Sequence, residues 1–98
     1  MNILVTGANG QLGSEIKDLA ANYNDSSFFF KDLPELDICN SDQLEVFIIE
    51  NKINTVINCA AYTAVDKAEE ETIIATKVNS EGVLNIVNAL NHVNGKLI

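Results

Sequence analysis

The chain has 98 residues, of which 47% are hydrophobic, so it suits one small globular domain rather than an intrinsically disordered segment. A formal net charge of −8 argues against nucleic acid and anionic membranes as partners, and the first apolar run is too short for a signal peptide or a membrane span. Cys39 and Cys59 form no CxxC motif and no Cys/His cluster, so we expect reduced, buried thiols in a cytoplasmic protein without a metal site.

The first residues form a glycine-rich motif. An apolar run at residues 3–5 leads into Gly7, and Gly10 and Gly13 follow at a spacing of three before an amphipathic segment. This order predicts a strand, a tight turn and a helix whose backbone can approach a nucleotide pyrophosphate. The free N–H groups and the dipole of the helix start favour such an anion. The alternative is an ordinary βα turn without a ligand.

The next segments predict a helix and a second strand. Residues 28–30 are three adjacent phenylalanines between polar neighbours, which is typical of a buried strand. We favour core packing over a base-stacking platform for them because the chain is acidic. The apolar stripe that predicts the helix before this strand consists of Leu12, Ile16, Leu19 and Tyr23.

Asp32 follows the predicted second strand, nineteen residues after Gly13. A carboxylate at an offset of roughly 20 residues binds the adenine ribose of a dinucleotide and repels a 2′-phosphate. Lys31 can offset that repulsion, so the choice between NAD and NADP stays open. The alternative is a solvated loop aspartate.

The middle of the chain continues the alternation. Residues 36–39 are expected to be a short extended piece, and Asn40 or Ser41 to cap a helix with residues 44, 47 and 48 on one face. Residues 55–61 predict a third strand that ends in small residues. These allow either a flat ligand or tight helix packing at the sheet edge.

The last third predicts a long helical stretch and the start of a strand. Residues 66–69 have capping-box spacing, Asn94 and Gly95 form a helix stop, and residues 96–98 begin a fourth strand. Strands alternating with helices predict a three-layer, Rossmann-type, doubly wound parallel sheet over residues 1–98, with its ligand site at the carboxyl ends of the strands. A strand that has only begun leads us to expect a truncated domain.

The sequence resembles the N-terminal part of extended short-chain dehydrogenases/reductases, and most closely the dTDP-4-dehydrorhamnose reductase family. The resemblance rests on the glycine motif at residues 6–13 and on residues 36–38, 58–69 and 78–82. The glycine motif marks only the superfamily, whereas residues 58–69 are much more specific. That family reduces the C4 ketone of a deoxyhexose nucleotide with NADPH or NADH in dTDP-L-rhamnose biosynthesis.

The resemblance also implies roles for individual residues. The glycine motif lines the pyrophosphate, Asp32 meets the adenosine ribose, and Asp37 with Ile38 holds the adenine. Residues 60–63 lie beside the ribose and nicotinamide. The candidate cofactor-binding residues are Gly7, Gly10, Gln11, Leu12, Gly13, Asp32, Asp37, Ile38, Ala60, Ala61, Tyr62 and Thr63.

The family's Tyr-x-x-x-Lys proton donor is missing from this chain. The tyrosines are Tyr23 and Tyr62, and Tyr62 is followed by Asp66 at the fourth position. We therefore expect no catalytic residue here, an inactive fragment, and a nucleotide-sugar substrate bound by a missing C-terminal part; homodimer formation is left open. The alternatives are an NAD-dependent nucleotide-sugar epimerase or dehydratase and a non-catalytic dinucleotide-sensing module.

Overall fold

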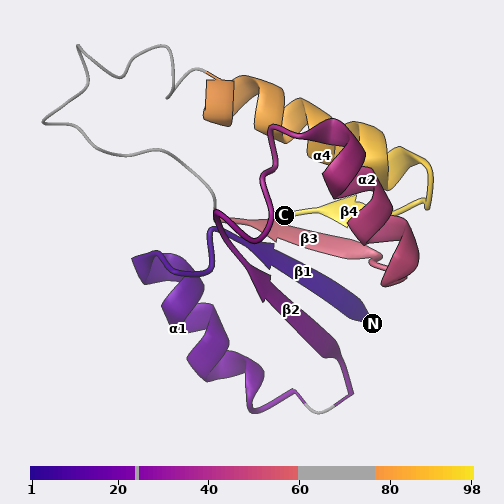
Figure 1. The fold of residues 1–98 in the computed structure, drawn as a ribbon. Coiled ribbons are helices and arrows are strands. Elements are labelled where there is room, and N and C mark those ends of the chain that lie inside the picture. Colours follow the sequence, from indigo (N-terminus) through magenta and orange to yellow (C-terminus); the bar gives the residue numbers. More distant parts are fainter. Residues whose placement is uncertain (24, 60–76) are drawn as a thin grey trace, which may run out of the picture.

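A computed structural model describes residues 1–23, 25–59 and 77–98, without the side chains of residues 77–79. These residues form a parallel sheet with the strand order β2-β1-β3-β4 (Figure 1). The strands are β1 (Asn2–Thr6), β2 (Ser27–Lys31), β3 (Thr55–Asn58) and β4 (Lys96–Leu97). The helices are α1 (Gln11–Ala20), α2 (Ser41–Glu50) and α4 (Val83–Asn91), and a π-helical segment, η2 (Lys77–Gly82), leads into α4.

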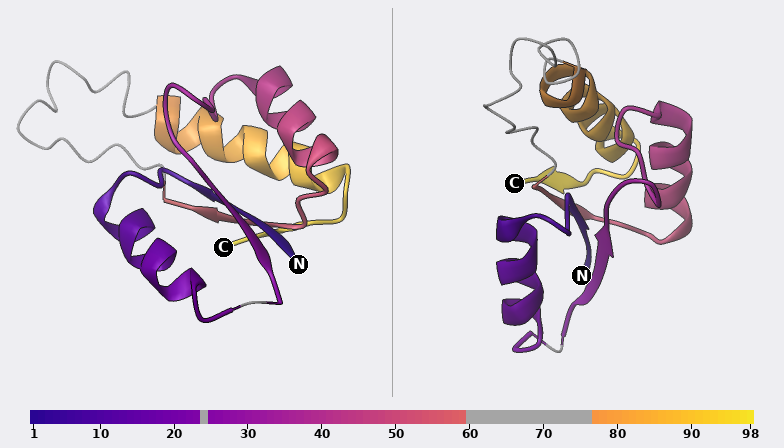
Figure 2. Two further views of the ribbon diagram at one scale, coloured as in Figure 1. Left: turned by 60° about the horizontal axis from the view of Figure 1, so that its bottom comes forward. Right: turned by 60° about the vertical axis from the view of Figure 1, so that its left-hand side comes forward.

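Helices cover both faces of this sheet (Figure 2). The chain moves in one direction from β1 to β2 and in the other from β2 to β3 and β4. Because parallel crossovers are right-handed, α1 lies on one face, the α1 face, and α2 and α4 pack together on the other, the α2/α4 face. The predicted doubly wound, three-layer architecture is therefore confirmed.

The main hydrophobic core lies on the α2/α4 face. Alternate residues of the central strands point into it, and helix residues at three- and four-residue spacing meet them. Asn40 caps α2, since its Oδ1 accepts a hydrogen bond from the Gln43 amide at 3.1 Å. Asn94 has a φ of 55° and lies in the turn between α4 and β4, where the sequence predicts the helix stop. The buried core residues are Leu4, Leu36, Ile38, Leu44, Ile48, Ile53, Val56, Ile86, Ala89 and Leu90.

The second strand is present, but the prediction that it is buried is wrong. Phe28, Phe29 and Phe30 are all half-buried, because β2 lies at the edge of the sheet and β1 is its one neighbouring strand in the described part of the chain. Phe28 and Phe30 stack on the α1 face with ring centroids 5.9 Å apart. Phe29 meets Phe47 of α2 edge-on at 6.0 Å on the opposite face. The phenylalanines therefore pack against both faces of the sheet.

The predicted helix after the glycine motif is also present, but its apolar stripe is not buried. Leu12 and Leu19 are each 58% exposed. Tyr23 is 62% exposed and lies beyond the end of the helix at Ala20. Gly13 is the one buried residue of α1, because no second helix among the described residues covers this face beside it.

Two smaller expectations need correction. Residues 36–39 form an irregular segment with a turn, not an extended piece, because hydrogen bonds to α2 hold the loop. Cys39 and Cys59 form no disulfide, as expected of reduced cysteines, but each is half-buried rather than buried. None of the described helices is long and apolar enough to cross a membrane.

Candidate cofactor site

The glycine turn joins β1 to α1 at the carboxyl edge of the sheet. Gly7 is buried and has a φ of 62°, a left-handed conformation that side chains disfavour. The Gly10 amide donates to the Gly7 carbonyl oxygen at 3.1 Å, which closes the turn. Gly10 is also the N-cap of α1, so no side chain at the cap satisfies the N–H groups of the first helical turn. The exposed start of α1 can therefore receive an anion.

The last two glycines of the motif differ in how much space the fold leaves for a side chain. A Cβ on Gly13 would lie 2.6 Å from Ala8 Cα and 2.7 Å from the Gly7 oxygen, so the fold itself requires glycine there. The sequence assigns this glycine to helix–strand packing, and the structure places the contact at the backbone of the turn. A Cβ on Gly10 would lie 3.4 Å from the Gly7 oxygen, its nearest neighbour among the described residues, which is an ordinary contact. Packing of the described residues therefore does not require glycine at position 10.

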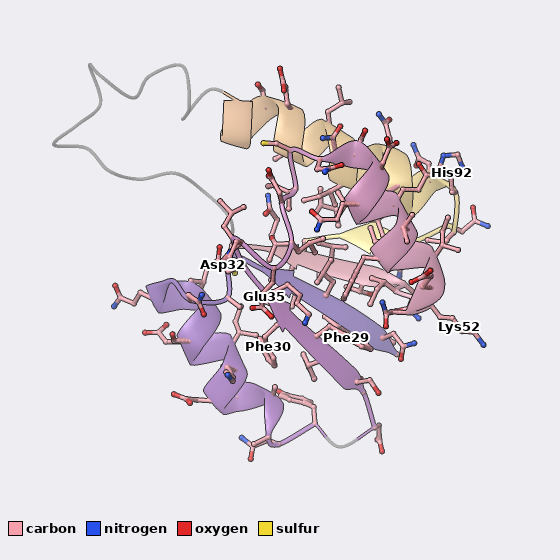
Figure 3. All side chains as sticks on the ribbon, viewed as in Figure 1. Phe29, Phe30, Asp32, Glu35, Lys52 and His92 are labelled. Carbon is pink, nitrogen blue, oxygen red and sulfur yellow. The ribbon has the colours of Figure 1, made fainter. Side chains whose placement is uncertain are left out.

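Asp32 stands beside this turn, as the sequence predicts (Figure 3). Its Oδ2 accepts a hydrogen bond from the Asn9 amide at 3.0 Å, and its Oδ1 accepts one from the Leu33 amide at 2.8 Å. The Ala8 amide donates to the Lys31 carbonyl oxygen at 3.2 Å. The end of β2 is thus tied to the glycine turn, and the half-buried carboxylate is fixed at its rim.

Lys31 is directed to the other side of the sheet. Successive residues of a strand point to opposite faces, and the Lys31 ammonium lies 3.5 Å from Glu35 Oε2 and 6.0 Å from the centre of the Phe47 ring. Both of these partners lie on the α2 side. The lysine that could offset the charge of Asp32 is therefore engaged elsewhere.

The loop that carries Asp37 and Ile38 is held by the first turn of α2. The Asp37 amide donates to Gln43 Oε1 at 3.0 Å, and Gln43 Nε2 donates to the Glu35 oxygen at 3.3 Å. Asp37 Oδ1 accepts from the Cys39 amide at 2.9 Å. These bonds give the loop a defined conformation beside the sheet edge.

Four of the predicted residues share one cavity. Gly7, Asp32, Asp37 and Ile38 line a space of about 50 Å³ between the turn and the loop. Pockets for whole ligands measure about 300–1,000 Å³, so this space can hold only part of a dinucleotide. The structure thus brings Gly7, Asp32, Asp37 and Ile38 together at one edge of the sheet.

Two residues at the start of α4 support this loop, and the sequence analysis did not find them. Asn85 Nδ2 donates to the Ile38 carbonyl oxygen at 2.9 Å. A Cβ on Gly82 would lie 2.5 Å from Ile38 Cδ1, so glycine lets this segment approach the loop closely. A glycine inside a helical pattern was the available signal, since it often marks such an approach.

The carboxyl ends of β1 and β3 are joined by a polar pair. Thr6 Oγ1 donates to Asn58 Oδ1 at 2.6 Å, and the Cys59 amide donates to the Thr6 oxygen at 3.1 Å. Partial burial raises the pKa of the Cys59 thiol above its ordinary value. The predicted contacts at Ala60, Ala61, Tyr62 and Thr63, and the capping box at 66–69, lie outside the described residues.

The glycine turn, the acidic residue after the second strand and the doubly wound parallel sheet define a dinucleotide-binding fold of the Rossmann type. The family model described as "RmlD substrate binding domain" matches residues 1–98. The chain belongs to this family.

Known members of the family are similar over nearly the whole chain. The dTDP-4-dehydrorhamnose reductase of Aggregatibacter actinomycetemcomitans is 41% identical over 87 residues, which are 89% of this chain and 30% of that protein. The crystal structure of a dTDP-4-dehydrorhamnose reductase from Clostridium acetobutylicum has a TM-score of 0.92 and 44% identity, and the match covers 99% of this chain and 34% of that one.

A third relative was solved with a dinucleotide. The dTDP-4-dehydrorhamnose reductase of Bacillus anthracis in complex with NADP has a TM-score of 0.89 and 36% identity, over 98% of this chain and 34% of that one. The chain therefore spans about a third of the length of these relatives.

Proposed function

We propose that this chain is the cofactor-binding part of an NAD(P)H-dependent dTDP-4-dehydrorhamnose reductase. One observation carries the proposal: the uncapped start of α1, the fixed carboxylate of Asp32 and the Asp37–Ile38 loop converge at one edge of the sheet. Backbone amides suit a pyrophosphate, a carboxylate suits a ribose, and an apolar side chain suits an adenine.

Each residue has a binding role in this proposal. The amides of Gln11 and Leu12 receive the pyrophosphate, while Gly7, Gly10 and Gly13 shape the turn around it. Asp32 accepts hydrogen bonds from the adenosine ribose. The residues that complete the site are Asp37 and Ile38 at the adenine, and Ala60, Ala61, Tyr62 and Thr63 beside the nicotinamide riboside.

When bound, NADH or NADPH would supply the hydride that reduces the C4 ketone of dTDP-4-dehydro-L-rhamnose to give dTDP-L-rhamnose. The described part of the chain binds and orients this cofactor. No Tyr-x-x-x-Lys motif occurs in the 98 residues, so we assign the proton donor and the nucleotide-sugar site to the rest of the protein. The segment alone should be inactive.

The wider setting follows from the same proposal. A biosynthetic reductase of this kind suits the cytoplasm, and the net charge of −8 on these 98 residues argues against nucleic acid or an anionic membrane as a partner of this segment. Its product would serve polysaccharide biosynthesis. A homodimer is compatible with this role, and gel filtration with light scattering of the full-length protein would measure it.

The test is an assay of the protein at the full length of its relatives. We expect oxidation of NADH or NADPH that depends on dTDP-4-dehydro-L-rhamnose, with dTDP-L-rhamnose formed in equal amount by mass spectrometry. Absence of this product would overturn the assignment. Tightly retained NAD without net oxidation would favour the epimerase or dehydratase alternative, and binding of a dinucleotide without turnover of any nucleotide sugar would favour a sensing module.

A further inference from the structure

The ribose end of the site carries a fixed negative charge. Both carboxylate oxygens of Asp32 accept backbone hydrogen bonds, from Asn9 at 3.0 Å and from Leu33 at 2.8 Å. Turning the carboxylate away would leave these two amides without that partner. A group that enters beside the glycine turn therefore meets Asp32 in this position.

The lysines whose side chains the structure describes do not pair with Asp32. Lys31 also lines the small cavity beside Asp32, but its ammonium lies 3.5 Å from Glu35 Oε2 and over the Phe47 ring of α2. Lys17 of α1 lies over the Phe30 ring, 5.8 Å from its centre. Lys52 lies at the end of the molecule away from Asp32 (Figure 3). Among the lysines whose side chains the structure describes, none has an ion pair or hydrogen bond to Asp32.

The chain also contains no arginine, since all six of its basic residues are lysines. The planar guanidinium group is the usual partner of the 2′-phosphate in NADP-binding sites of this fold, because it forms two parallel hydrogen bonds to phosphate. A phosphate monoester adds a charge of about −1.5 to −2 at neutral pH. It would be placed beside a carboxylate in a chain whose net charge is already −8.

We propose that Asp32 makes this site selective for NADH over NADPH, through hydrogen bonds to the ribose hydroxyls and repulsion of a 2′-phosphate. This inference rests on the proposed cofactor role of the same site. The Bacillus anthracis relative was solved with NADP, so selectivity would differ among relatives that share the fold. The residue that sets the selectivity between NADH and NADPH would then lie at the end of β2.

Equilibrium binding to the full-length protein tests the proposal without relying on turnover. We expect a Kd for NADH at least about tenfold below that for NADPH, because repulsion acts on one ligand only. Since charge repulsion is screened by salt, the difference should narrow as ionic strength rises. Equal affinities, or tighter binding of NADPH, would overturn the proposal while leaving the proposed reductase function intact. Failure to bind either dinucleotide would overturn both.

Two variants separate the contributions of the neighbouring residues. Asp32→Asn keeps one hydrogen-bond acceptor and removes the charge, so the ratio of the two Kd values should fall toward one. Lys31→Gln should leave the ratio within about twofold, because that side chain faces the other side of the strand. A ratio unchanged in D32N would contradict the assignment to Asp32. A large change in K31Q would show instead that the lysine sets the selectivity.

Discussion

The side chains on the two faces of the sheet are buried to very different extents. On the α2/α4 face, Leu44 and Ile86 are fully buried in a continuous core. On the α1 face, Leu19 and Tyr23 are more than half exposed. An apolar groove of about 340 Å³, partly lined by Ile16, runs along that side. Packing of the described residues therefore stabilises mainly one face.

This difference divides the candidate site into two halves that are held in different ways. The α2/α4 face positions the loop that carries Asp37 and Ile38 through side chains, since Gln43 and Asn85 both hydrogen-bond to it. The α1 face contributes backbone, and α1 is kept against the turn by the close approach at Gly13. The main hydrophobic core and the uncapped start of α1 thus lie on different faces of the same sheet.

The largest expected difference between the faces is in stability. Leu44→Ala removes a fully buried side chain and should lower the free energy of unfolding by about 2–5 kcal/mol. Leu19→Ala, on the open face, should cost less than about 1 kcal/mol because that side chain is 58% exposed. Urea denaturation of the full-length protein measures both. Similar losses in the two variants would show that the rest of the protein covers the α1 face.

A pair of glycine variants separates folding from binding within the turn. Gly13→Ala places a methyl group against backbone atoms and should cost about 1–3 kcal/mol of stability. Gly10→Ala has room for its methyl group, so its stability should change by less than about 1 kcal/mol. Its affinity for NADH should nevertheless fall about tenfold, because the methyl group occupies the path of the phosphate. Unchanged affinity in G10A would contradict the predicted backbone contact.

On the α2/α4 face, Asn85 should contribute more to stability and to dinucleotide binding than Asn88 of the same helix. Asn85→Ala removes the hydrogen bond to the Ile38 oxygen and should cost about 1 kcal/mol, with weaker dinucleotide binding as the loop loosens. Asn88→Ala is the matched control, because Asn88 is exposed and the change in helix propensity is the same. Thermal unfolding and NADH titration compare the two variants. Equal effects would mean that Asn85 does not position the loop.

The smallest effect concerns Cys59, where β1 and β3 meet. Because burial raises its pKa, less thiolate is present at a given pH than in an unfolded chain, and alkylation should be slower in the folded protein. The rate should rise as the pH approaches and passes the raised pKa. Peptide mapping by mass spectrometry, with urea-unfolded protein as the reference, follows this one site. Faster alkylation in the folded state would contradict a raised pKa.

The sequence alone predicted the alternation of strands and helices, because apolar periodicity and glycine spacing are local properties. It also indicated the family, the glycine turn, and the place of Asp32 beside that turn. These depend on short motifs and on a fixed offset along the chain. Asn40 was one of two proposed caps for the second helix, and its side chain accepts the expected hydrogen bond.

Tertiary structure alone decided which apolar residues are buried and what supports the site. The three phenylalanines of β2 predict a buried core strand from local sequence. The strand order, however, puts β2 at the edge of the sheet. The leucines of α1 have helical spacing, yet their burial depends on what else covers that face. Asn85 meets Ile38 across 47 residues of sequence, and Lys31 is separated from its neighbour Asp32 by the pleat of one strand. Such relations follow from packing and strand order, which local sequence patterns do not encode.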